Sequence, residues 1–552
     1  MFKEGTLEEY YTLIHEGEFR PRTVHERLEM AVHWLLNHRV ETLGHLQEHL
    51  QDLLDRYITP AAEGYDVRKR MLVLAGPPGS GKSTLVHLLK EALVYISKTE
   101  EGAIFQLKEC PLHEDPLLAL PEKERKELNH AVSLQIEGFL SSKNQLRLKE
   151  NFQEDWRKLP VERVYLSFEK RIGIGDFHPG DPYNQELNEL IGSIDFSSIT
   201  TYGSSSDPRS YRYDGEFQVA NRGIVELHEF FKNIPSFLYV FQSITEERLY
   251  KIPKQSNVYP DVLPIAHTNM AELESFLKRP ENESLSTRML FHSIPYNLNV
   301  DDEVKYYRMK MKSEDHEKLC FHALNTLAET VIISRLVFHT AEYSIEERLK
   351  LYKSGLDEPF GKDGFIGMQP RFVLDVLSEC MSKFEIVDAN VLLNQLKFRI
   401  DSDLRLKSSE KEKYKISIEI ARELYYNRIA FEVYQALEEY EYDRWQELLQ
   451  QIVKKLSAKD LFIDKETTDS FKEERLEEWI CSKSIRAESM SMFPDFIQEE
   501  LRQKIFLSFF HQFQSPEKFL DWVRETFLLE INRNQQITFE MIEDWVYESI
   551  LK

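Results

Sequence analysis

The sequence is poor in cysteine, and this scarcity limits the kinds of protein that it can encode. Among 552 residues there are 4 cysteines, which lie far apart and form no C-x-x-C pair: Cys110, Cys320, Cys380 and Cys481. Such spacing argues against a disulfide framework or a zinc site. It favours buried thiols in a reducing cytosol.

Long hydrophobic runs are also missing. No stretch of about 18 apolar residues occurs in the chain, and its N-terminal Met-Phe-Lys-Glu-Gly does not resemble the start of a signal peptide. We therefore expect a cytoplasmic protein without a membrane-spanning segment.

Positive charge is scarce relative to negative charge. The chain has 70 Lys and Arg against 94 Asp and Glu, which gives a formal net charge of −24. Because nucleic acids and anionic membranes repel an acidic protein, we expect neither as a general partner, although a local basic patch is compatible with this average. The length and the 42% of hydrophobic residues are typical of a globular protein of roughly three or four domains.

One short stretch carries the clearest chemical signal. The apolar residues Leu72–Ala75 predict a buried strand, Gly76–Ser83 fit the pattern G-x-x-x-x-G-K-[ST], and apolar residues follow at helical spacing. This order is typical of a phosphate-binding P-loop, in which backbone N–H groups and a helix N-terminus surround an anion. The sequence predicts that ATP or GTP is bound by Gly76, Pro77, Pro78, Gly79, Ser80, Gly81, Lys82, Ser83 and Thr84.

Two side chains of this loop have separate predicted roles. The Lys82 ammonium would reach the β- and γ-phosphates, and the Ser83 hydroxyl would be a ligand of Mg²⁺. We therefore expect ATP and Mg²⁺ as cofactors.

The surrounding sequence predicts an α/β core that follows a helical segment. Residues 1–60 have a helical period that Pro60 ends, whereas residues 61–300 alternate short apolar runs with helices, which predicts a parallel sheet covered on both faces. A long insertion rich in Gly, Pro, Asp and Ser occupies about 108–220. The strands expected in this core are Met71–Ala75, Ala103–Leu107, Val164–Leu166, Ile224–Leu227, Phe237–Phe241 and Val262–Ala266.

Strand signals fade after residue 300. Residues 301–379 predict a helical lid, and residues 380–552 are almost wholly helical in pattern. The predicted fold class is therefore an α/β P-loop NTPase with an AAA+-like parallel sheet, a helical lid and an all-helical C-terminal domain.

Cleavage of a nucleotide also needs a carboxylate near the γ-phosphate. The stretch Ile224–Glu229 resembles a Walker B strand, with two departures: His228 stands where a metal-organising Asp is usual, and Glu226 interrupts the apolar run. We interpret Glu229 as the base that orients the attacking water and Glu226 as a water-mediated contact to Mg²⁺. The alternative for both is an acidic, solvated start of a helix.

Three further polar residues fit the active site of the AAA+ class. Asn269 follows the strand Val262–Ala266, where an amide would hold the lytic water as a sensor-1 residue; the alternative is a helix N-cap. Arg288, before a strand-like Met289–Phe291, suits an arginine finger that reaches a neighbouring subunit. Arg371 opens a helix of the lid and resembles sensor 2, although a surface arginine would look the same.

Several further stretches accompany these motifs: Arg171–Gly173, Phe177–Asp181, Leu190–Asp195, Ala220–Glu226, Ala266–Asn269 and Gly367–Phe372. Together with the P-loop, they resemble the PrkA-type serine protein kinases, over roughly residues 15–400 and more weakly to about 485. The inserted segment is the most family-specific feature, and the last segment departs from typical members by being shorter.

The resemblance implies a cytoplasmic protein with an AAA+ module at 61–300 and a PrkA-like helical domain at 380–552. It also implies autophosphorylation and the phosphorylation of protein serines. The residues themselves show no G-x-G-x-x-G over a β3 lysine, no H-R-D and no D-F-G. Transfer to a serine could still occur at the P-loop, because catalysis there is mostly positioning and charge neutralisation.

Two other functions stay open at this point. An AAA+ ATPase could pass the phosphate to water and remodel a protein client, as one subunit of a homo-oligomeric ring. A nucleotide-dependent scaffold could instead bind partners through its helical half with little turnover. The partners expected are thus a protein substrate or client and other copies of the chain.

Overall fold

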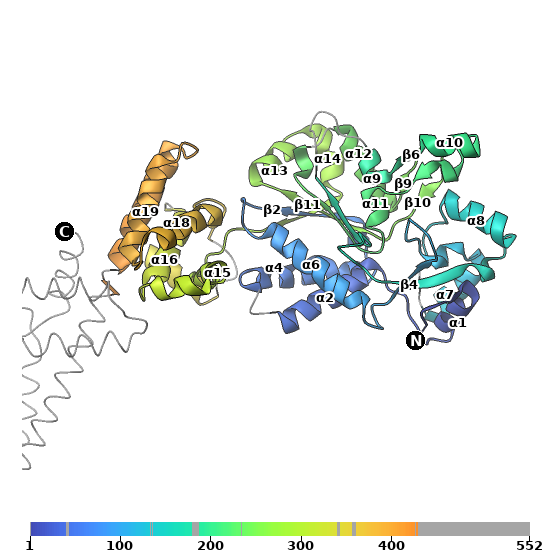
Figure 1. The fold of residues 1–552 in the computed structure, drawn as a ribbon, viewed down its shortest axis with the longest axis horizontal. Helices are drawn as coiled ribbons and strands as arrows, with labels where there is room; N and C mark the ends of the chain where they lie inside the picture. The colour runs from blue at the N-terminus through green and yellow to red at the C-terminus, as the bar shows by residue number, and fades with distance from the viewer. Residues whose placement is uncertain are drawn as a thin grey trace, which may run out of the picture. The chain divides into compact units, whose positions relative to one another are not determined.

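The computed structural model of the chain describes residues 2–428, except for 40–42, 133, 135, 179–186, 233–234, 339–342, 356–359 and 426. The predicted helical region at 380–552 therefore lies within the described residues only as far as 428. The chain divides into two compact units, Met1–Tyr296 and Asn297–Lys552 (Figure 1).

A parallel sheet forms the centre of the first unit. Its strands lie in the order β12 (Met289–Ser293), β2 (Met71–Ala75), β11 (Leu263–Thr268), β8 (Ile224–Leu227) and β5 (Ile174–Phe177), and every neighbouring pair is parallel. All residues of β2, β8 and β11 are buried, as expected when both faces of a parallel sheet are covered. The predictions of strands at Met71–Ala75 and Ile224–Leu227 are confirmed, and that at Val262–Ala266 is confirmed to within two residues.

Helices cover both faces of this sheet (Figure 1). The helices α2 (Val24–His38), α4 (Leu46–Leu53) and α6 (Lys82–Ser97) pack in one apolar cluster with Leu72 and Leu74 of β2. The helices α12 (Pro235–Glu247), α13 (Met270–Leu277) and α14 (Glu283–Ser286) contribute to a second cluster with Met71 and Val73. Alternate residues of β2 thus serve opposite faces, and each buried side chain adds about 1.5–3 kcal/mol.

Two predicted strands belong to a different sheet. β3 (Ile104–Leu107) and β4 (Pro160–Val164) pair antiparallel with each other, and β1 (Glu4–Thr6) pairs with the other edge of β4. The prediction at Ala103–Leu107 was right about the strand and wrong about its sheet, whereas the strand predicted at Val164–Leu166 ends at Val164. An apolar run indicates a strand but does not identify the strand that pairs with it.

The prediction of a strand at Phe237–Phe241 was wrong, because this run lies within helix α12. Leu238, Phe241 and Ile244 are buried at intervals of three residues, which is a helical spacing. A short apolar run cannot by itself distinguish a strand from a buried helical segment.

The N-terminal segment also differs from the prediction in two places. It begins with a strand, β1, and its last helix does not end at Pro60, because helix α5 (Thr59–Ala62) includes this residue in its first turn. Proline is tolerated there because the N–H groups of a first turn have no intrahelical partner.

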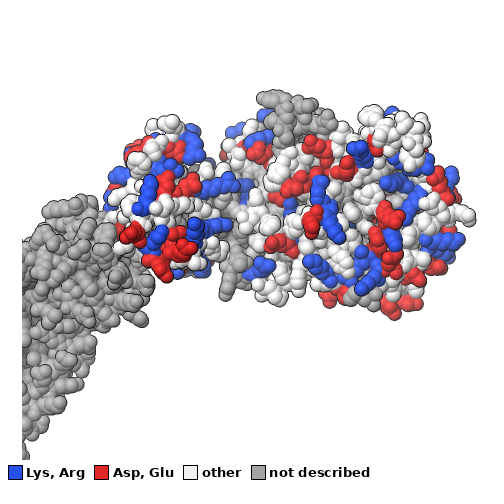
Figure 2. Space-filling model, in the orientation of Figure 1, with Lys and Arg blue, Asp and Glu red and all other residues white. Residues whose placement is uncertain are grey.

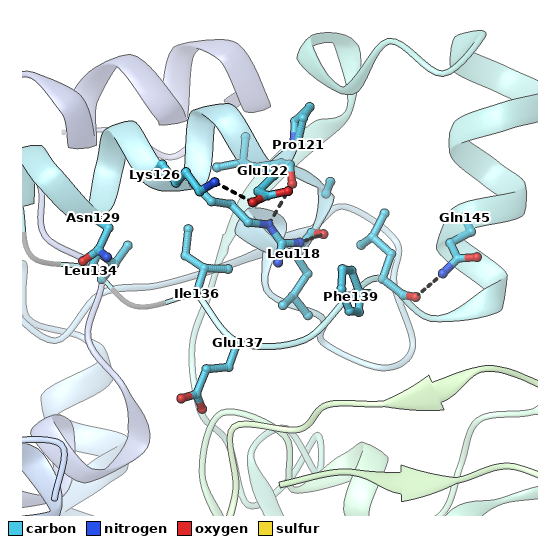
Figure 3. Close-up of a pocket in the computed structure, with 14 residues that line it drawn as sticks. Leu118, Pro121, Glu122, Lys126, Asn129, Leu134, Ile136, Glu137, Phe139 and Gln145 are labelled. Atoms are coloured by element: carbon cyan, nitrogen blue, oxygen red, sulfur yellow. Dashed lines mark hydrogen bonds and ion pairs between the residues drawn. The ribbon is translucent and has the colours of Figure 1, made fainter. Parts of the chain in front are cut away.

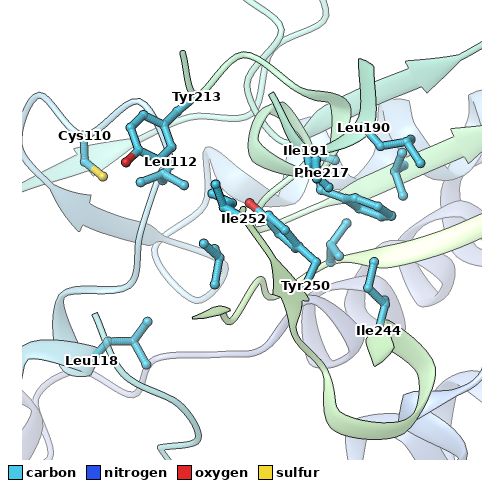
Figure 4. Close-up of a cluster of buried hydrophobic side chains, with 14 of the residues drawn as sticks. Cys110, Leu112, Leu118, Leu190, Ile191, Tyr213, Phe217, Ile244, Tyr250 and Ile252 are labelled. Atoms are coloured by element: carbon cyan, nitrogen blue, oxygen red, sulfur yellow. The ribbon is translucent and has the colours of Figure 1, made fainter. Parts of the chain in front are cut away.

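The insertion between the P-loop and β8 is more ordered than its composition suggests. It contains helices α7 (Glu122–Val132), α8 (Ser142–Phe152), α9 (Asn188–Ile191) and α10 (Phe196–Tyr202), and it supplies β5 to the central sheet. Figure 4 shows part of the apolar cluster that joins the insertion to the core, in which Cys110, Ile191 and Tyr213 of the insertion belong with Ile244 and Tyr250. The insertion is therefore part of the folded unit.

The second unit is helical as far as it is described. Its helices include α15 (Val300–Lys310), α16 (Ala323–Arg335), α17 (Ile345–Lys353), α18 (Pro370–Lys383) and α19 (Ala389–Ser402), and residues 408–425 are also helical. They enclose the fully buried Arg335, whose guanidinium donates to both oxygens of Glu303 at 2.9 and 3.0 Å. For the described residues between 301 and 428, the prediction of a helical region is confirmed.

Cys110 and Cys380 are buried free thiols, as predicted, whereas Cys320 is only partly buried. Cys481 lies outside the described residues. Across the described ranges, no helix is long and apolar enough to cross a membrane.

Candidate functional site at the carboxyl edge of the sheet

The parallel sheet brings the predicted functional stretches to one edge. Because the strands all run in the same direction, the loops that follow β2, β8 and β11 leave from their carboxyl ends, which is where parallel α/β sheets bind ligands. The registers align Ala75 with Thr268 and Leu227 with both Ala266 and Phe177. The P-loop therefore lies at the same edge as His228, Glu229 and Asn269.

The P-loop has the backbone that phosphate binding requires. Gly79 and Gly81 have φ of +83° and +101°, and α6 begins directly afterwards at Lys82, so the loop curls into the N-terminus of a helix of 16 residues. A Cβ at Gly76 would lie 2.1 Å from the backbone oxygen of Ile294. Only glycine fits at that position.

The Lys82 ammonium donates to the carbonyl oxygens of Gly76 and Pro77, each at 2.8 Å. Burial lowers the pKa of Lys82 to about 8, although the charge of Glu272 opposes this shift. A half-buried ammonium gains more free energy from a bond to a phosphate anion than from bonds to neutral carbonyl dipoles. Ser83 and Thr84 are exposed at the start of α6, so these residues fit a nucleotide and its Mg²⁺, with Ser83 as the residue that would hold the ion.

The N-terminal segment lies against this loop. The ring nitrogen Nε2 of His45, just before α4, is 3.1 Å from the carbonyl oxygen of Ser80. The start of α4 therefore lies beside the predicted nucleotide site.

Glu226 is buried in β8 and pairs with two basic side chains. Lys90 of α6 bonds Oε2, and His267 Nε2 of β11 lies 2.8 Å from Oε1. Burial alone would raise the pKa of Glu226, but the hydrogen bond from His267 and the charge of Lys90 lower it to about 2. The residue that interrupts the apolar strand is thus an ionised carboxylate with both oxygens engaged, and its contact to Mg²⁺ stays a prediction.

His228 and Asp176 extend this cluster toward solvent. His228 Nε2 lies 2.9 Å from Asp176 Oδ1, and the ring of His178 stacks on that of His228 with centroids 3.8 Å apart. Burial would raise the pKa of Asp176, whereas the hydrogen bond from His228 and the charge of Lys90 hold it below its usual range. The residue at the usual position of the metal-organising Asp therefore faces a carboxylate from the neighbouring strand.

Glu229 and Asn269 both have partners in this structure. The Glu229 side chain is 58% exposed and pairs with Lys232 at 2.7 Å, and its φ is +48°. Asn269 Oδ1 accepts from the backbone N–H of Glu272 at 2.9 Å, which makes it the N-cap of α13. Asn269 therefore has the N-cap role that the sequence offered as the alternative to sensor 1. The roles of Glu229 and Asn269 in ATP cleavage stay predictions.

The two predicted arginines lie in different units. Arg288 precedes β12 at the amino edge of the sheet, opposite the P-loop edge, and pairs with Glu246 at 2.9 Å. Arg371 lies in the first turn of α18 in the second unit and is exposed. Their roles as arginine finger and sensor 2 stay predictions.

Sequence reasoning assigned no role to Lys90, Asp176 or Glu272. The role of Lys90 could have been predicted from the sequence, because a lysine on the apolar face of a predicted helix needs a buried acid as its partner. Asp176 lies in the strand missed within the insertion. Glu272 follows Asn269 by three residues, and it faces Lys232 at 3.4 Å.

A hollow of about 710 Å³ lies elsewhere, between α7 and the loop that leads to α8 (Figure 3). Its charged side chains already have partners: Glu122 pairs with Lys126 at 2.6 Å, and Arg125 donates to the carbonyl oxygens of Leu118, Leu120 and Gly138. On the described surface that Figure 2 shows, basic and acidic side chains are intermixed.

Comparison with known proteins identifies two family matches. Residues 38–342 match the PrkA AAA domain, and residues 339–527 match the PrkA serine protein kinase C-terminal domain. The ATP-dependent protease PrkA of Bacillus subtilis (strain 168) is 34% identical over 449 residues, which cover 76% of this chain and 71% of that protein. The serine/threonine kinase YeaG of Escherichia coli (strain K12) is 25% identical over 421 residues, which cover 68% of this chain and 64% of that protein.

Among solved structures, NtrX from Brucella abortus in complex with ADP matches 66% of this chain and 62% of its own with 9% identity. Its TM-score of 0.31 is too low to support an inference.

Proposed function

This chain belongs to the PrkA family, and from that membership and the geometry of the sheet edge we propose that it is an ATPase. It binds ATP with Mg²⁺ at Gly76–Thr84 and cleaves the γ-phosphate, with water as the acceptor. The observation that carries the proposal is the position of the P-loop lysine, Lys82, whose ammonium bonds two backbone carbonyls of a loop that has the positive-φ glycines phosphate binding requires.

The residues at the carboxyl edge of the sheet have separate roles in this proposal. Lys82 leaves the carbonyls of Gly76 and Pro77 and pairs with the β- and γ-phosphates, while the N–H groups of the loop hold the same anion. Ser83 would hold Mg²⁺, and Glu226 would contact it through water. When bound, the ion neutralises charge that develops on the phosphate oxygens.

Glu229 orients the attacking water, and Asn269 holds that water from the neighbouring strand. Both need to give up a present contact: Glu229 its ion pair with Lys232, and Asn269 its cap of α13. Because an exposed ion pair contributes only about 0–1 kcal/mol, nucleotide binding can readily release Glu229.

A second candidate function is the transfer of the phosphate to protein serine. It is supported by the name of the Escherichia coli relatives, serine/threonine kinase YeaG, and by the match to the PrkA serine protein kinase C-terminal domain. The name of the Bacillus subtilis relative, ATP-dependent protease PrkA, adds ATP-driven proteolysis as a further outcome. In both cases we propose a protein as the substrate or client.

One experiment separates these outcomes. The full chain is incubated with Mg²⁺, γ-labelled ATP and casein, and label in free phosphate, label on serine and casein fragments are measured together. We expect free phosphate in excess over label on protein. Label that stays on serine would replace the ATPase proposal with the kinase, and casein fragments that require ATP would add proteolysis. If none of the three products forms, the ATPase proposal is refuted and the nucleotide-dependent scaffold is favoured.

Lys82→Ala is the variant that tests the site itself. It should lose ATP affinity and all three products, because the lysine supplies the positive charge that the phosphates meet. Lys98→Ala, at the exposed C-cap of the same helix α6, is the matched control and should behave as the wild type. Undiminished ATP binding by Lys82→Ala would refute the proposed site.

A further inference from the structure

We propose that Asp176, His178 and His228 form a binding site for a transition-metal ion of the Zn²⁺ type, separate from the Mg²⁺ that accompanies ATP. Each residue offers one ligand atom, and these atoms all lie within 4.8 Å of one another. The site would use one carboxylate oxygen and two imidazole nitrogens.

Two neighbouring strands build this arrangement. Asp176 and His178 flank Phe177 at the end of β5, and His228 directly follows β8. The backbone N–H of His228 donates to the carbonyl oxygen of Phe177 at 3.0 Å. This bond continues the ladder beyond β8 and holds the ends of the two strands together. Asp176 is therefore held within the sheet, and the backbone of His228 is bonded to the end of the neighbouring strand.

Both imidazoles converge on the same carboxylate oxygen. The Nε2 atoms of His228 and His178 lie 2.9 and 3.2 Å from Asp176 Oδ1, and the two rings are nearly parallel, with an interplanar angle of 11°. In a protein without a metal, each ring would need a proton on Nε2 to bond this oxygen. A metal ion accepts lone pairs from all three groups at once.

The ligand chemistry selects the class of ion. Two imidazoles and one carboxylate are typical of Zn²⁺ sites that keep an open fourth position. Mg²⁺ is bound by oxygen ligands and suits imidazole poorly. The side chains of Asp176 and His178 are 49% and 66% exposed, so an ion and a water molecule can reach the site.

The surroundings favour a cation. A hollow of about 470 Å³ adjoins the site and is lined by Asp176, His178, Glu189, Asp214 and Glu216 among others. Its acidic side chains would raise the local concentration of cations. Two basic side chains oppose this charge: Lys90 lies 4.0 Å from Asp176 Oδ2 but already pairs with Glu226, and Arg171 pairs with Glu216.

The site also differs from the predicted Mg²⁺ site in its residues. Ser83 lies on the P-loop after β2, which is separated from β8 by β11. Glu226 Oε1 lies 3.4 Å from His228 Nε2, but Glu226 is engaged by Lys90 and His267 and is not one of the three proposed ligands. Metal binding can therefore be measured without nucleotide, independently of the proposed ATPase.

The test uses the full chain, purified without a histidine tag and freed of metals by a chelator. Zn²⁺ binding is measured by titration calorimetry, and Co²⁺ is added as a spectroscopic probe of nitrogen ligation. We expect one Zn²⁺ per chain without ATP, Co²⁺ absorption of the kind that imidazole ligands give, and no displacement of Zn²⁺ by excess Mg²⁺.

Three variants identify the ligands. Asp176→Asn, His178→Gln and His228→Asn should each weaken Zn²⁺ binding by at least about tenfold, as the loss of a direct ligand should exceed the effect of losing its supporting contacts. His33→Gln, at an exposed position of α2, is the control and should bind Zn²⁺ as the wild type does.

Circular dichroism reports whether each variant is folded. If a variant unfolds, the Co²⁺ spectrum of the wild type with and without a competing chelator still tests the ligand type. Zn²⁺ binding that is unchanged in the folded His178→Gln and His228→Asn variants, or absent from the wild type, would overturn the proposal.

Discussion

At the scale of single residues, the two glutamates near the end of β8 have opposite environments. The Glu226 side chain is 6% exposed and paired on both oxygens, whereas Glu229 is 58% exposed and meets one lysine. Removing either partner of a buried pair leaves an uncompensated charge, so Glu226 is suited to hold the site together. Glu229 is the carboxylate that can move toward a water molecule.

Glu229→Gln should reduce ATP turnover by about 10²-fold or more, which is the usual contribution of a positioned base. ATP binding should persist because Lys82 and the loop are unaffected. Released phosphate under single-turnover conditions and the retention of labelled ATP on a filter measure the two effects.

The matched control is Glu274→Gln on α13, an exposed glutamate that also pairs with a lysine, Lys278 at 3.7 Å. It should leave turnover unchanged. Turnover by Glu229→Gln equal to that of the wild type would show that another group orients the water.

At the scale of elements, caps and strand ends place the charged groups, and α19 gives a measurable case. Asp388 is its N-cap, accepts from the backbone N–H of Val391, and is 1% exposed. Burial raises the pKa of Asp388 to about 6. The folded state therefore prefers the protonated acid, so this stabilising preference is complete below about pH 4 and is lost as the pH rises through about 6.

Asp388→Asn should make α19 less sensitive to pH, because asparagine caps a helix about as well as aspartate and carries no charge. Between about pH 4 and 6.5 the wild-type helix should lose up to about 2 kcal/mol relative to the variant. Hydrogen exchange of peptides from Ala389–Ser402, compared at each pH between the two proteins, measures the difference.

Asp403→Asn provides the control at the other end of α19. Interactions with Arg405 hold the pKa of Asp403 at about 2, so this group stays ionised across the same range. Its variant should keep the pH response of the wild type. Equal pH responses of Asp388→Asn and the wild type would contradict the assignment to Asp388.

At the scale of the whole molecule, the position of Arg288 has a consequence for assembly. It lies at the amino edge of the sheet, whereas the P-loop lies at the carboxyl edge, so β12 separates this arginine from the P-loop of its own unit. We therefore propose that any action of Arg288 on a γ-phosphate is exerted on another copy of the chain, as in the homo-oligomeric ring expected from the sequence.

Mixing two inactive proteins tests action between subunits. Arg288→Ala keeps its nucleotide site, and Lys82→Ala keeps its arginine, so each alone should be nearly inactive and the mixture should recover part of the activity. The specific activity of the wild type should also rise with protein concentration. Arg279→Ala, exposed before β12, is the control for a loss of surface charge.

A mixture as inactive as its components, together with a specific activity independent of concentration, would exclude a finger that acts between subunits. Arg288 would then serve its pairing with Glu246 and its bonds to Ser284 within one chain.

By itself, the sequence determined those features that depend on residues close together in the chain. The glycines and lysine of Gly76–Thr84 are close in the chain, and the apolar runs of β2, β8 and β11 mark strands buried on both faces, so the P-loop and most of the core were predictable. The family also followed from motifs that are short and contiguous. These features depend on backbone conformation and burial within a few residues.

Only the tertiary structure decided which distant residues meet. Glu226 and Lys90 are separated by 136 positions, and Asp176 meets His228 because β5, hidden in a glycine-containing insertion, pairs with β8. For the same reason, the local sequence pattern predicts a strand at Phe237–Phe241, which is helical, and assigns β3 to the wrong sheet. Strand pairing and ion pairing are chosen by the packing of the whole unit, because a local apolar or charged pattern is compatible with many partners.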